Sequence, residues 1–349
     1  MSEKTKIAWC DSTVNPVHGC DKVSDGCKNC YITSTTPFRV SGMKHGDPRT
    51  YHPNAFKLAE KLNRRPWICD RCGASGEYEF GECDCGKTTS HRRRIFWESL
   101  GDFLDTKWEI AWLAAMLDTI RRCDQCVHII VSKRWENFES RLGKVCGTFG
   151  WKEGTKRTPA HEFVAGWVSG IRVPKNIIGL CSVENQEVFW ERVPQFVDVP
   201  LACRGLSMEP LLGEIDMELQ HGCRSCNHPG NIISGLGPCE RCNGTRHEPS
   251  GIDWIIVGGE SGDKARPCNV VGIRELVEQG KSAGVPVYVK QLGFRPITSE
   301  ETLDGWPAGT RLTSRSCETA LVNLRDKKGG DPEEWPADLR VRQFPVLKN

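Results

Sequence analysis

Nineteen cysteines in a chain of 349 residues constrain this protein more than any other feature of its sequence. That number is too small for a disulfide-stapled miniature scaffold and high for an ordinary enzyme. The net charge is +2 and the first residues contain no apolar signal-peptide core, so we expect a cytoplasmic protein with reduced thiols. In that compartment a regular cysteine pattern indicates metal binding or catalysis.

The first group of cysteines lies on one short loop and consists of Cys20, Cys27 and Cys30. Three thiolates can hold three irons of a [4Fe–4S] cluster and leave the fourth iron open to a small ligand. A structural zinc ion normally takes four protein ligands, and His18 could supply the fourth here. A third interpretation is that these cysteines only pack. Spacing alone favours the iron–sulfur cluster and leaves the other two open.

Two further groups of four cysteines predict two structural Zn²⁺ sites. One group is Cys69, Cys72, Cys83 and Cys85, and the other is Cys223, Cys226, Cys239 and Cys242. We expect residues 66–91 and 218–250 to be insertions of the zinc-ribbon kind, folded by their metal because they are too small to have a core. The alternatives are loops with unligated thiols, or ribbons that contact nucleic acid.

Short apolar runs alternate with helical patterns along most of the chain. The runs are Thr13–Val17, Arg94–Trp97, Val127–Val131, Ile177–Cys181, Leu201–Leu206, Trp254–Val257 and Val285–Val289. Helices are expected over Trp108–Arg121 and Val271–Ala283. This alternation predicts an α/β fold, a full or partial (β/α) TIM-like barrel over residues 1–295. Residues 296–349 are rich in Pro, Gly and charge and predict an irregular appendage.

Polar residues follow several of the predicted strands. Glu184, Glu209, Glu260 and Lys290 are the candidate catalytic residues, because active sites of such barrels lie at the carboxyl ends of the strands. For each of them alone, a helix N-cap is the simpler interpretation. We expect all four to line one cavity, with the loop of Cys20–Cys30 at its rim.

The segment IAWCDSTVNPVHGCDKVSDGCKNCY resembles the opening of a phage and prophage family of unknown function that is described by its three-cysteine motif. The segments HIIVSKRWENF, GLCSVENQ, LSMEPLLGEID, DWIIVGGESGDKARP and GVPVYVKQLG match as well, so the resemblance covers about residues 6–295. The family looks distantly like radical S-adenosylmethionine enzymes, which have partial (β/α)6 barrels.

This resemblance implies a [4Fe–4S] cluster on Cys20, Cys27 and Cys30 and a site for S-adenosylmethionine. In those enzymes a Gly-Gly-Glu near the second strand holds the methionine amine. Here Gly258 and Gly259 precede Glu260, but near the sixth predicted strand. The cysteine motif departs too, with six residues between Cys20 and Cys27 where those enzymes have three.

The leading hypothesis is therefore a radical-type iron–sulfur enzyme of the cytoplasm, which is the host cytoplasm if a phage encodes it. The sequence does not identify its substrate, and a nucleic acid or nucleotide is the option that a phage setting and zinc ribbons suggest. The alternative is a non-catalytic, zinc-dependent nucleic-acid-binding protein, in which His91–Arg94 (HRRR) contact phosphate. A metal-dependent hydrolase is the third hypothesis, but His-x-His and H-E-x-x-H motifs are absent from the sequence. The longest clean apolar run, Ile110–Leu117, is too short for a membrane span. The sequence is compatible with a partner protein but does not identify one.

Overall fold

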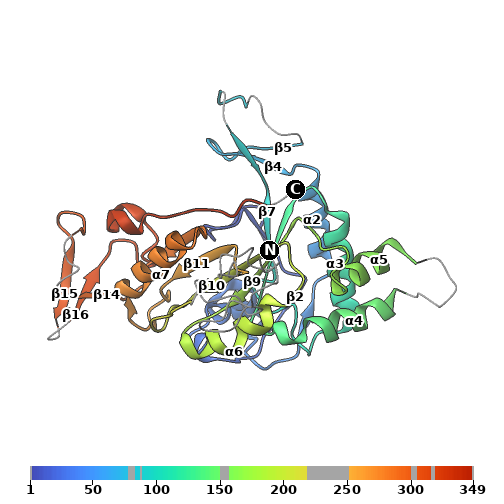
Figure 1. Ribbon diagram of the computed structural model, residues 1–349, viewed down its shortest axis with the longest axis horizontal. Helices are drawn as coiled ribbons and strands as arrows, with labels where there is room; N and C mark the ends of the chain where they lie inside the picture. The colour runs from blue at the N-terminus through green and yellow to red at the C-terminus, as the bar shows by residue number, and fades with distance from the viewer. Residues whose placement is uncertain are drawn as a thin grey trace, which may run out of the picture. The chain divides into compact units, whose positions relative to one another are not determined.

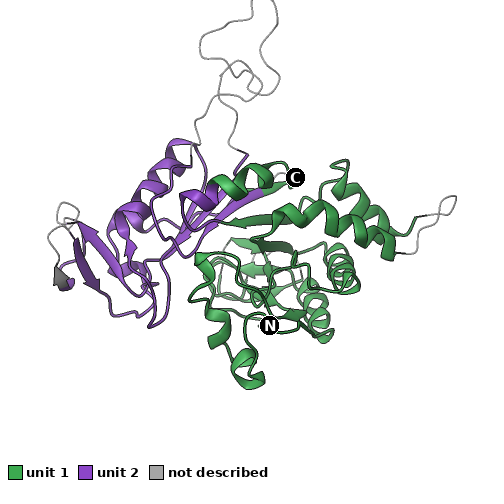
Figure 2. Cartoon of the chain, turned by 90° about the horizontal axis from the view of Figure 1, so that it is seen from below, with its two compact units in different colours: residues 1–182, 190–203, 346–349 green, residues 183–189, 204–345 purple. Residues whose placement is uncertain are grey.

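The computed structural model has an α/β fold (Figure 1), and it describes residues 2–77, 83–86, 89–149, 157–217, 251–299, 305–315 and 319–347. The chain divides into two compact units (Figure 2). The first holds residues 1–182, 190–203 and 346–349, and the second holds residues 183–189 and 204–345. No helix within the described ranges has the length and apolar character to cross a membrane.

Parallel strands form the centre of the fold. Four of them pair in chain order, namely β1 (Ser12–Val14), β7 (Arg94–Trp97), β8 (Val127–Ser132) and β9 (Ile177–Ser182). Three more also pair in parallel, namely β10 (Cys203–Met208), β11 (Trp254–Gly258) and β13 (Val287–Gln291). The sheet order is β1-β7-β8-β9-β10-β11-β13, so each strand lies beside the next parallel strand along the chain. This is the winding of a (β/α) barrel, and a partial TIM-like barrel is confirmed.

Amphipathic helices follow the strands and cover them. In the first unit α2 (Asn54–Asn63), α3 (Ile110–Arg122), α4 (Phe138–Thr148) and α5 (Pro159–Val168) pack side by side (Figure 1). Helix α3 buries Leu113, Met116, Leu117 and Ile120, which share one face at helical spacing. In the second unit α7 (Val270–Ser282) packs on β11 and β13. Strands β9 and β11 are buried along their whole length, as expected of strands covered on both faces.

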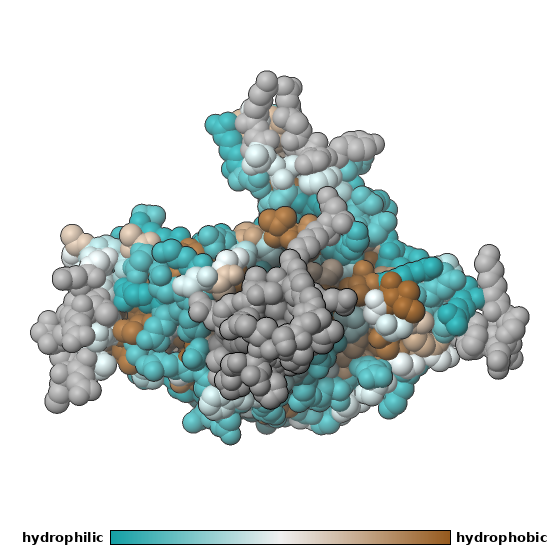
Figure 3. Space-filling model, in the orientation of Figure 1, coloured by the Kyte–Doolittle hydropathy of each residue, from teal (hydrophilic) through white to brown (hydrophobic). Residues whose placement is uncertain are grey.

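Two further helices are the short α1 (Thr36–Ser41) after the three-cysteine loop and the longer α6 (Gln186–Val197) after β9. Outside the grey segments, hydrophilic residues cover most of the face shown in Figure 3, with scattered apolar patches. That distribution agrees with a charged fraction of 26%.

Small antiparallel sheets extend the barrel. Strands β4 (Trp67–Cys69), β5 (Ser75–Gly76) and β6 (Ser90–Arg92) form one of them between β1 and β7 along the chain, where an insertion was expected. Strand β2 (Val17–His18) pairs with β3 (Thr50–Tyr51). The other expected insertion, residues 218–250, lies outside the described residues, together with Cys223, Cys226, Cys239 and Cys242.

The expectation of an irregular C-terminal segment is wrong for much of residues 296–323. Strands β14 (Pro296–Ser299), β16 (Thr319–Asn323) and β15 (Arg311–Arg315) form a sheet with β12 (Cys268–Asn269). The reason is alternation, because β16 turns Ala320 and Val322 inward within a polar sequence. Trp335 is fully buried, and its indole N–H donates to the Gly329 carbonyl. The domain boundary at residue 295 stays a prediction.

Candidate functional site

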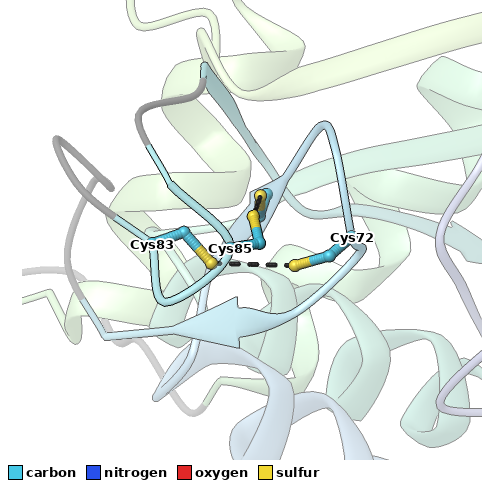
Figure 4. Close-up of side chains that lie close together, drawn as sticks. Cys72, Cys83 and Cys85 are labelled. Carbon is cyan, nitrogen blue, oxygen red and sulfur yellow. Dashed lines mark hydrogen bonds between the residues drawn. The ribbon is translucent and has the colours of Figure 1, made fainter.

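Four cysteines of the first insertion form a candidate metal centre. The sulfur atoms of Cys69, Cys72, Cys83 and Cys85 all lie within 4.8 Å of one another. The distance is 3.7 Å between the sulfurs of Cys69 and Cys85, and 3.6 Å between those of Cys72 and Cys83 (Figure 4). A tetrahedral zinc ion with Zn–S bonds of ~2.3 Å has sulfur–sulfur edges of about 3.8 Å. The four thiols therefore fit one tetrahedral metal ion.

Tight turns build both halves of this centre. The Gly73 N–H donates to the Cys69 carbonyl, and the Gly86 N–H donates to the Cys83 carbonyl. Both glycines have a positive φ, +69° and +108°, which side chains with a Cβ rarely adopt. The backbone N–H of Cys72 points at the Cys69 sulfur and lowers the pKa of that thiol to about 6. The lowered pKa favours the thiolate, which is the form that binds metal.

A histidine connects this centre to the edge of the parallel sheet. His91 Nδ1 lies 2.6 Å from Asp70 Oδ1, and its Nε2 lies 3.2 Å from the carboxylate of Asp11. Asp11 in turn accepts from the backbone and side chain of Arg94. Since Asp70 directly follows a metal-ligand position, the metal centre and strand β7 are joined by one continuous polar network.

The side chains of the HRRR segment are committed to internal partners. Arg92 Nε donates to the Gln125 carbonyl, Arg93 Nη1 donates to Ser12 Oγ, and Arg94 pairs with Asp11. Arg93 is only 4% exposed. The interpretation of this segment as a phosphate contact is therefore disfavoured, because its charged groups already have partners.

The three-cysteine loop leaves the sheet at the carboxyl end of β1. Cys27 is buried, and the half-buried Cys20 and Cys30 pack with Met43 against an apolar cluster of Ile32, Phe38 and Leu100. Burial raises the pKa of the Cys20 thiol to about 12, and it raises that of Cys30 as well. Among the described residues these three thiols are not part of a group within 4.8 Å. Thiolates bound to separate irons of one cluster lie farther apart, about 6–7 Å.

His18 does not join the loop thiols in a tight ligand set. Its ring packs on the ring of His52, with 4.0 Å between the two centroids. Burial lowers the pKa of His18 to about 4, so the imidazole is neutral at physiological pH. A closed zinc site made of His18 and the three cysteines is therefore not preformed in the described part of the chain.

A buried charged network lies beside the loop, and sequence analysis did not select its residues. Arg134 Nη1 donates to Asp102 Oδ2 at 2.7 Å, and Ser132 Oγ donates to Asp102 Oδ1 at 2.7 Å. Arg134 also reaches the loop, with 4.0 Å between Nη1 and the Cys20 sulfur and a bond from Nη2 to the Asp21 carbonyl. The sequence feature that could have identified these residues is the presence of polar side chains at the end of β8 and in the segment after β7.

A second buried arginine anchors the same end of the loop. The side chain of Arg49 is 1% exposed, and its Nε donates to Asp105 Oδ2 at 2.8 Å. Its Nη2 also pairs with Asp21 at 3.0 Å, and Lys107 pairs with Asp21 at 2.8 Å. Asp21 follows Cys20 directly, so two arginines fix the backbone at the first cysteine of the loop.

A cavity of about 290 Å³ opens at the carboxyl end of β8. Its lining includes Val23 of the three-cysteine loop, Lys133 and Arg134 after β8, and Arg192 of α6. Glu136 also lines it, and burial raises the pKa of this carboxyl. All of the lining residues belong to the first unit. The cavity thus combines cationic and carboxyl groups next to the loop.

In the second unit the structure brings some of the predicted site residues together. Lys290 Nζ lies 2.9 Å from Glu209 Oε1, and Glu260 accepts two bonds from the side chain of Arg266. Glu184 is 1% exposed, and its carbonyl accepts from the Leu212 N–H. The cavity that all four predicted residues were expected to share with the three-cysteine loop stays a prediction.

Close packing explains why positions 258 and 259 are glycine, in addition to the predicted contact with a cofactor. A Cβ on Gly258 would lie 2.9 Å from the Gln291 carbonyl oxygen and 3.1 Å from Glu209 Oε1. A Cβ on Gly259 would overlap the Leu292 carbonyl oxygen. Close approach of β11 and the segment after β13 therefore requires glycine at both positions.

Comparison with known proteins gives a family without an activity. A search of the curated proteins finds no match, and a search of the solved structures finds none either. The family model described as "Protein of unknown function (DUF5131)" matches residues 4–325, which is nearly the whole chain. The chain therefore belongs to the DUF5131 family of proteins of unknown function.

Proposed function

We propose that this protein is an iron–sulfur enzyme whose cluster is bound by Cys20, Cys27 and Cys30. The observation that carries the proposal is the position of these thiols on the loop that follows β1 and β2, with Cys20 beside the buried pair of Asp102 and Arg134. Active sites of parallel α/β folds lie at the carboxyl ends of the strands. Soft thiolate ligands select zinc or iron–sulfur clusters, and three thiolates on one loop can hold three irons of a [4Fe–4S] cluster.

Burial raises the pKa of the Cys20 thiol, and the guanidinium of Arg134 is the neighbouring group that offsets part of this cost for a thiolate bound to iron. Arg134 places a guanidinium N–H 4.0 Å from the Cys20 sulfur, and a positive charge there stabilises the anionic form. Asp102 fixes the guanidinium and balances its charge. A cluster held by three thiolates supplies one iron without a protein ligand, where a small molecule such as S-adenosylmethionine can bind.

The cavity beside the loop is the proposed substrate site. Lys133, Arg192 and Glu136 line it, and Arg192 Nη1 also donates to the Ser182 carbonyl. A substrate with a phosphate group, such as a nucleotide or a nucleic acid end, matches the two cations. Glu209 and Lys290 of the second unit form an ion pair and remain the proposed catalytic pair there, with Glu184 and Glu260 as further candidates.

The four-cysteine centre has a structural role in this proposal. Its segment contributes three short strands and little apolar burial, so its folding depends on the metal. We propose zinc as that metal, because the sulfur–sulfur distances match a zinc tetrahedron.

Metal analysis of protein purified without oxygen tests the proposal. We expect a brown protein with about four irons and four sulfides per chain, together with zinc. Changing Cys20, Cys27 or Cys30 to Ser should remove iron and sulfide and leave zinc in place. Cys146→Ser is the matched control, because Cys146 is a half-buried cysteine of α4 outside both groups.

One result would replace the proposal with the alternative. If reconstitution with iron and sulfide gives no cluster, and zinc instead binds the three loop thiols, the protein is not an iron–sulfur enzyme. A zinc-dependent nucleic-acid-binding protein would then be the better interpretation. Binding of single- and double-stranded oligonucleotides by the zinc-loaded chain would test that alternative directly.

A further inference from the structure

We infer that Glu98 forms a buried site for a monovalent cation together with the backbone carbonyl oxygens of Val17 and Gly19. This site is separate from both cysteine groups and does not depend on the proposed iron–sulfur chemistry. One carboxylate oxygen of Glu98 is buried without a hydrogen-bond partner, no cationic side chain of the described residues pairs with it, and two backbone carbonyl oxygens lie close by.

The side chain of Glu98 is buried, and only one of its two carboxylate oxygens accepts a hydrogen bond. Glu98 is 2% exposed, and its Oε1 accepts a hydrogen bond from the Val17 N–H at 3.1 Å. Its Oε2 is buried and has no hydrogen-bond partner. Glu98 is also the one non-glycine residue with a positive φ, +64°, among the residues that the structure describes. A strained backbone at a buried carboxylate is a feature of functional sites rather than of ordinary packing.

No cationic side chain of the described residues pairs with this carboxylate. Within the described ranges, no Lys, Arg or His side chain forms an ion pair with Glu98, and the charged side chain that acts on it is the carboxylate of Asp102. The charge of Asp102 is itself balanced by Arg134. A buried carboxylate without a counter-ion is strongly unfavourable, so it must hold either a proton or a cation.

The three atoms nearest to the Cβ position of Gly101 are all oxygens. A Cβ built on Gly101 would lie 2.8 Å from Glu98 Oε2, 3.3 Å from the Gly19 carbonyl oxygen and 3.5 Å from the Val17 carbonyl oxygen. Hard cations prefer oxygen ligands, and backbone carbonyls can replace the hydration shell of K⁺. One carboxylate and two neutral carbonyls carry a single negative charge, which a monovalent cation balances.

The site lies where two parallel strands end. The Gly19 N–H donates to the Leu100 carbonyl, and the Glu98 N–H donates to the Val14 carbonyl, so the segments after β1 and β7 already run together. A cation between Glu98 and Gly19 would add a further link between them. Because Gly19 directly precedes Cys20, the cation would also fix the first residue of the three-cysteine loop.

Thermal unfolding of the full chain in different salts tests this inference. The protein is exchanged into choline chloride, and its Tm is then compared in KCl, NaCl and choline chloride at equal ionic strength. For a Kd of about 10 mM, 100 mM cation raises the folding equilibrium constant about tenfold. We expect a higher Tm in KCl or NaCl than in choline chloride, increasing with cation concentration.

Two variants and one control locate the effect. Glu98→Gln removes the charge, and Gly101→Ala puts a methyl group into the space, so both should lose the cation dependence. Gly143→Ala should keep it, because a Cβ on Gly143 in α4 meets nothing within 4 Å. An equal Tm in all three salts, with Glu98→Gln as stable as the unchanged protein, would show that Glu98 holds a proton and overturn the inference.

Crystals soaked in thallium(I) acetate provide a test that does not need the variants to fold. Thallium(I) replaces K⁺ and scatters anomalously. We expect an anomalous peak at a position where the ion coordinates both Glu98 Oε2 and the Gly19 carbonyl oxygen. No peak at that position would equally overturn the inference.

Discussion

The guanidinium of Arg134 lies between a carboxylate and a thiol, with 2.7 Å from Nη1 to Asp102 Oδ2 and 4.0 Å to the Cys20 sulfur. Arg134 and Asp102 are 8% and 4% exposed, so the pair is buried. This one side chain therefore connects the end of β8 with the segment after β7 and with the three-cysteine loop.

Removing Arg134 should destabilise the protein strongly. Arg134→Met leaves Asp102 as an uncompensated buried charge, which costs about 3–5 kcal/mol. Urea unfolding measures the change, and the double variant with Asp102→Asn should recover part of it. Arg121→Met is the control, because the Arg121–Asp118 pair is partly exposed on α3 and should contribute about 0.3–0.5 kcal/mol. Equal losses for both arginines would contradict a special role of the buried pair.

Stability should fall as the pH drops below about 6.5, because of His128. His128 is fully buried, accepts from Trp97 Nε1 at Nδ1, and faces the Cys123 carbonyl with Nε2. Burial lowers its pKa from the ordinary value near 6.5 to about 4. The unfolded chain therefore binds a proton first as the pH falls.

The buried neutral His128 contributes fully to the free energy of unfolding above about pH 6.5, and this contribution is lost as the pH falls from 6.5 to about 4. Between pH 7.5 and 4.5 this single group should cost about 2–3 kcal/mol of unfolding free energy. Urea titrations at both pH values measure the loss, and His128→Gln should show a smaller difference between them. The same difference in both proteins would assign the pH dependence to other groups.

Cys69→Ser should remove one metal ion per chain and loosen its own insertion only. The parallel sheet does not use this segment for its core, so far-UV circular dichroism should change little. Trypsin should cut faster near Arg71, which in the intact centre donates to the Cys85 carbonyl. Cys223→Ser is expected to remove a second zinc by the same logic. Full metal retention in Cys69→Ser would show that the four thiols do not bind the ion together.

Gly259→Ala should destabilise the second unit without any cofactor present. The new Cβ would overlap the Leu292 carbonyl oxygen, and backbone cannot move aside easily, so we expect a loss of about 1–3 kcal/mol. Gly272→Ala in α7 is the control, because its Cβ would be 3.6 Å from Leu211 and alanine favours a helix by up to about 1 kcal/mol. If Gly259→Ala keeps full stability but loses ligand binding, the glycine serves the ligand instead.

Much of the fold could be predicted because its local patterns agree with its tertiary structure. The run WIIV is a strand buried along its length, VHIIV is a strand buried at every position except Val131, and the helical face of Leu113, Met116 and Leu117 packs inward. The strands after residue 295 were missed because they are short and separated by Pro- and Gly-rich segments. Strand alternation of four or five residues is a weak signal on its own.

The candidate site was harder to predict, because it depends on residues far apart in the sequence. The four cysteines of the insertion have a local spacing that specifies a metal centre. In contrast, the pairing of Arg134 with Asp102 depends on how β7 and β8 align, and no local pattern encodes it. The positive φ of Glu98 likewise follows from tertiary contacts, since glutamate has no preference for that conformation.

The pairing of Trp67 with Arg92 has a consequence for how this chain can change length. Because these residues are neighbours across β4 and β6, the insertion that carries the four cysteines enters and leaves the barrel at almost the same point. The Arg93 N–H, one residue later, donates to the Pro66 carbonyl and closes the base of the insertion. The segment is therefore modular: a shorter or longer piece of chain can replace it at this junction while β1 and β7 keep their register.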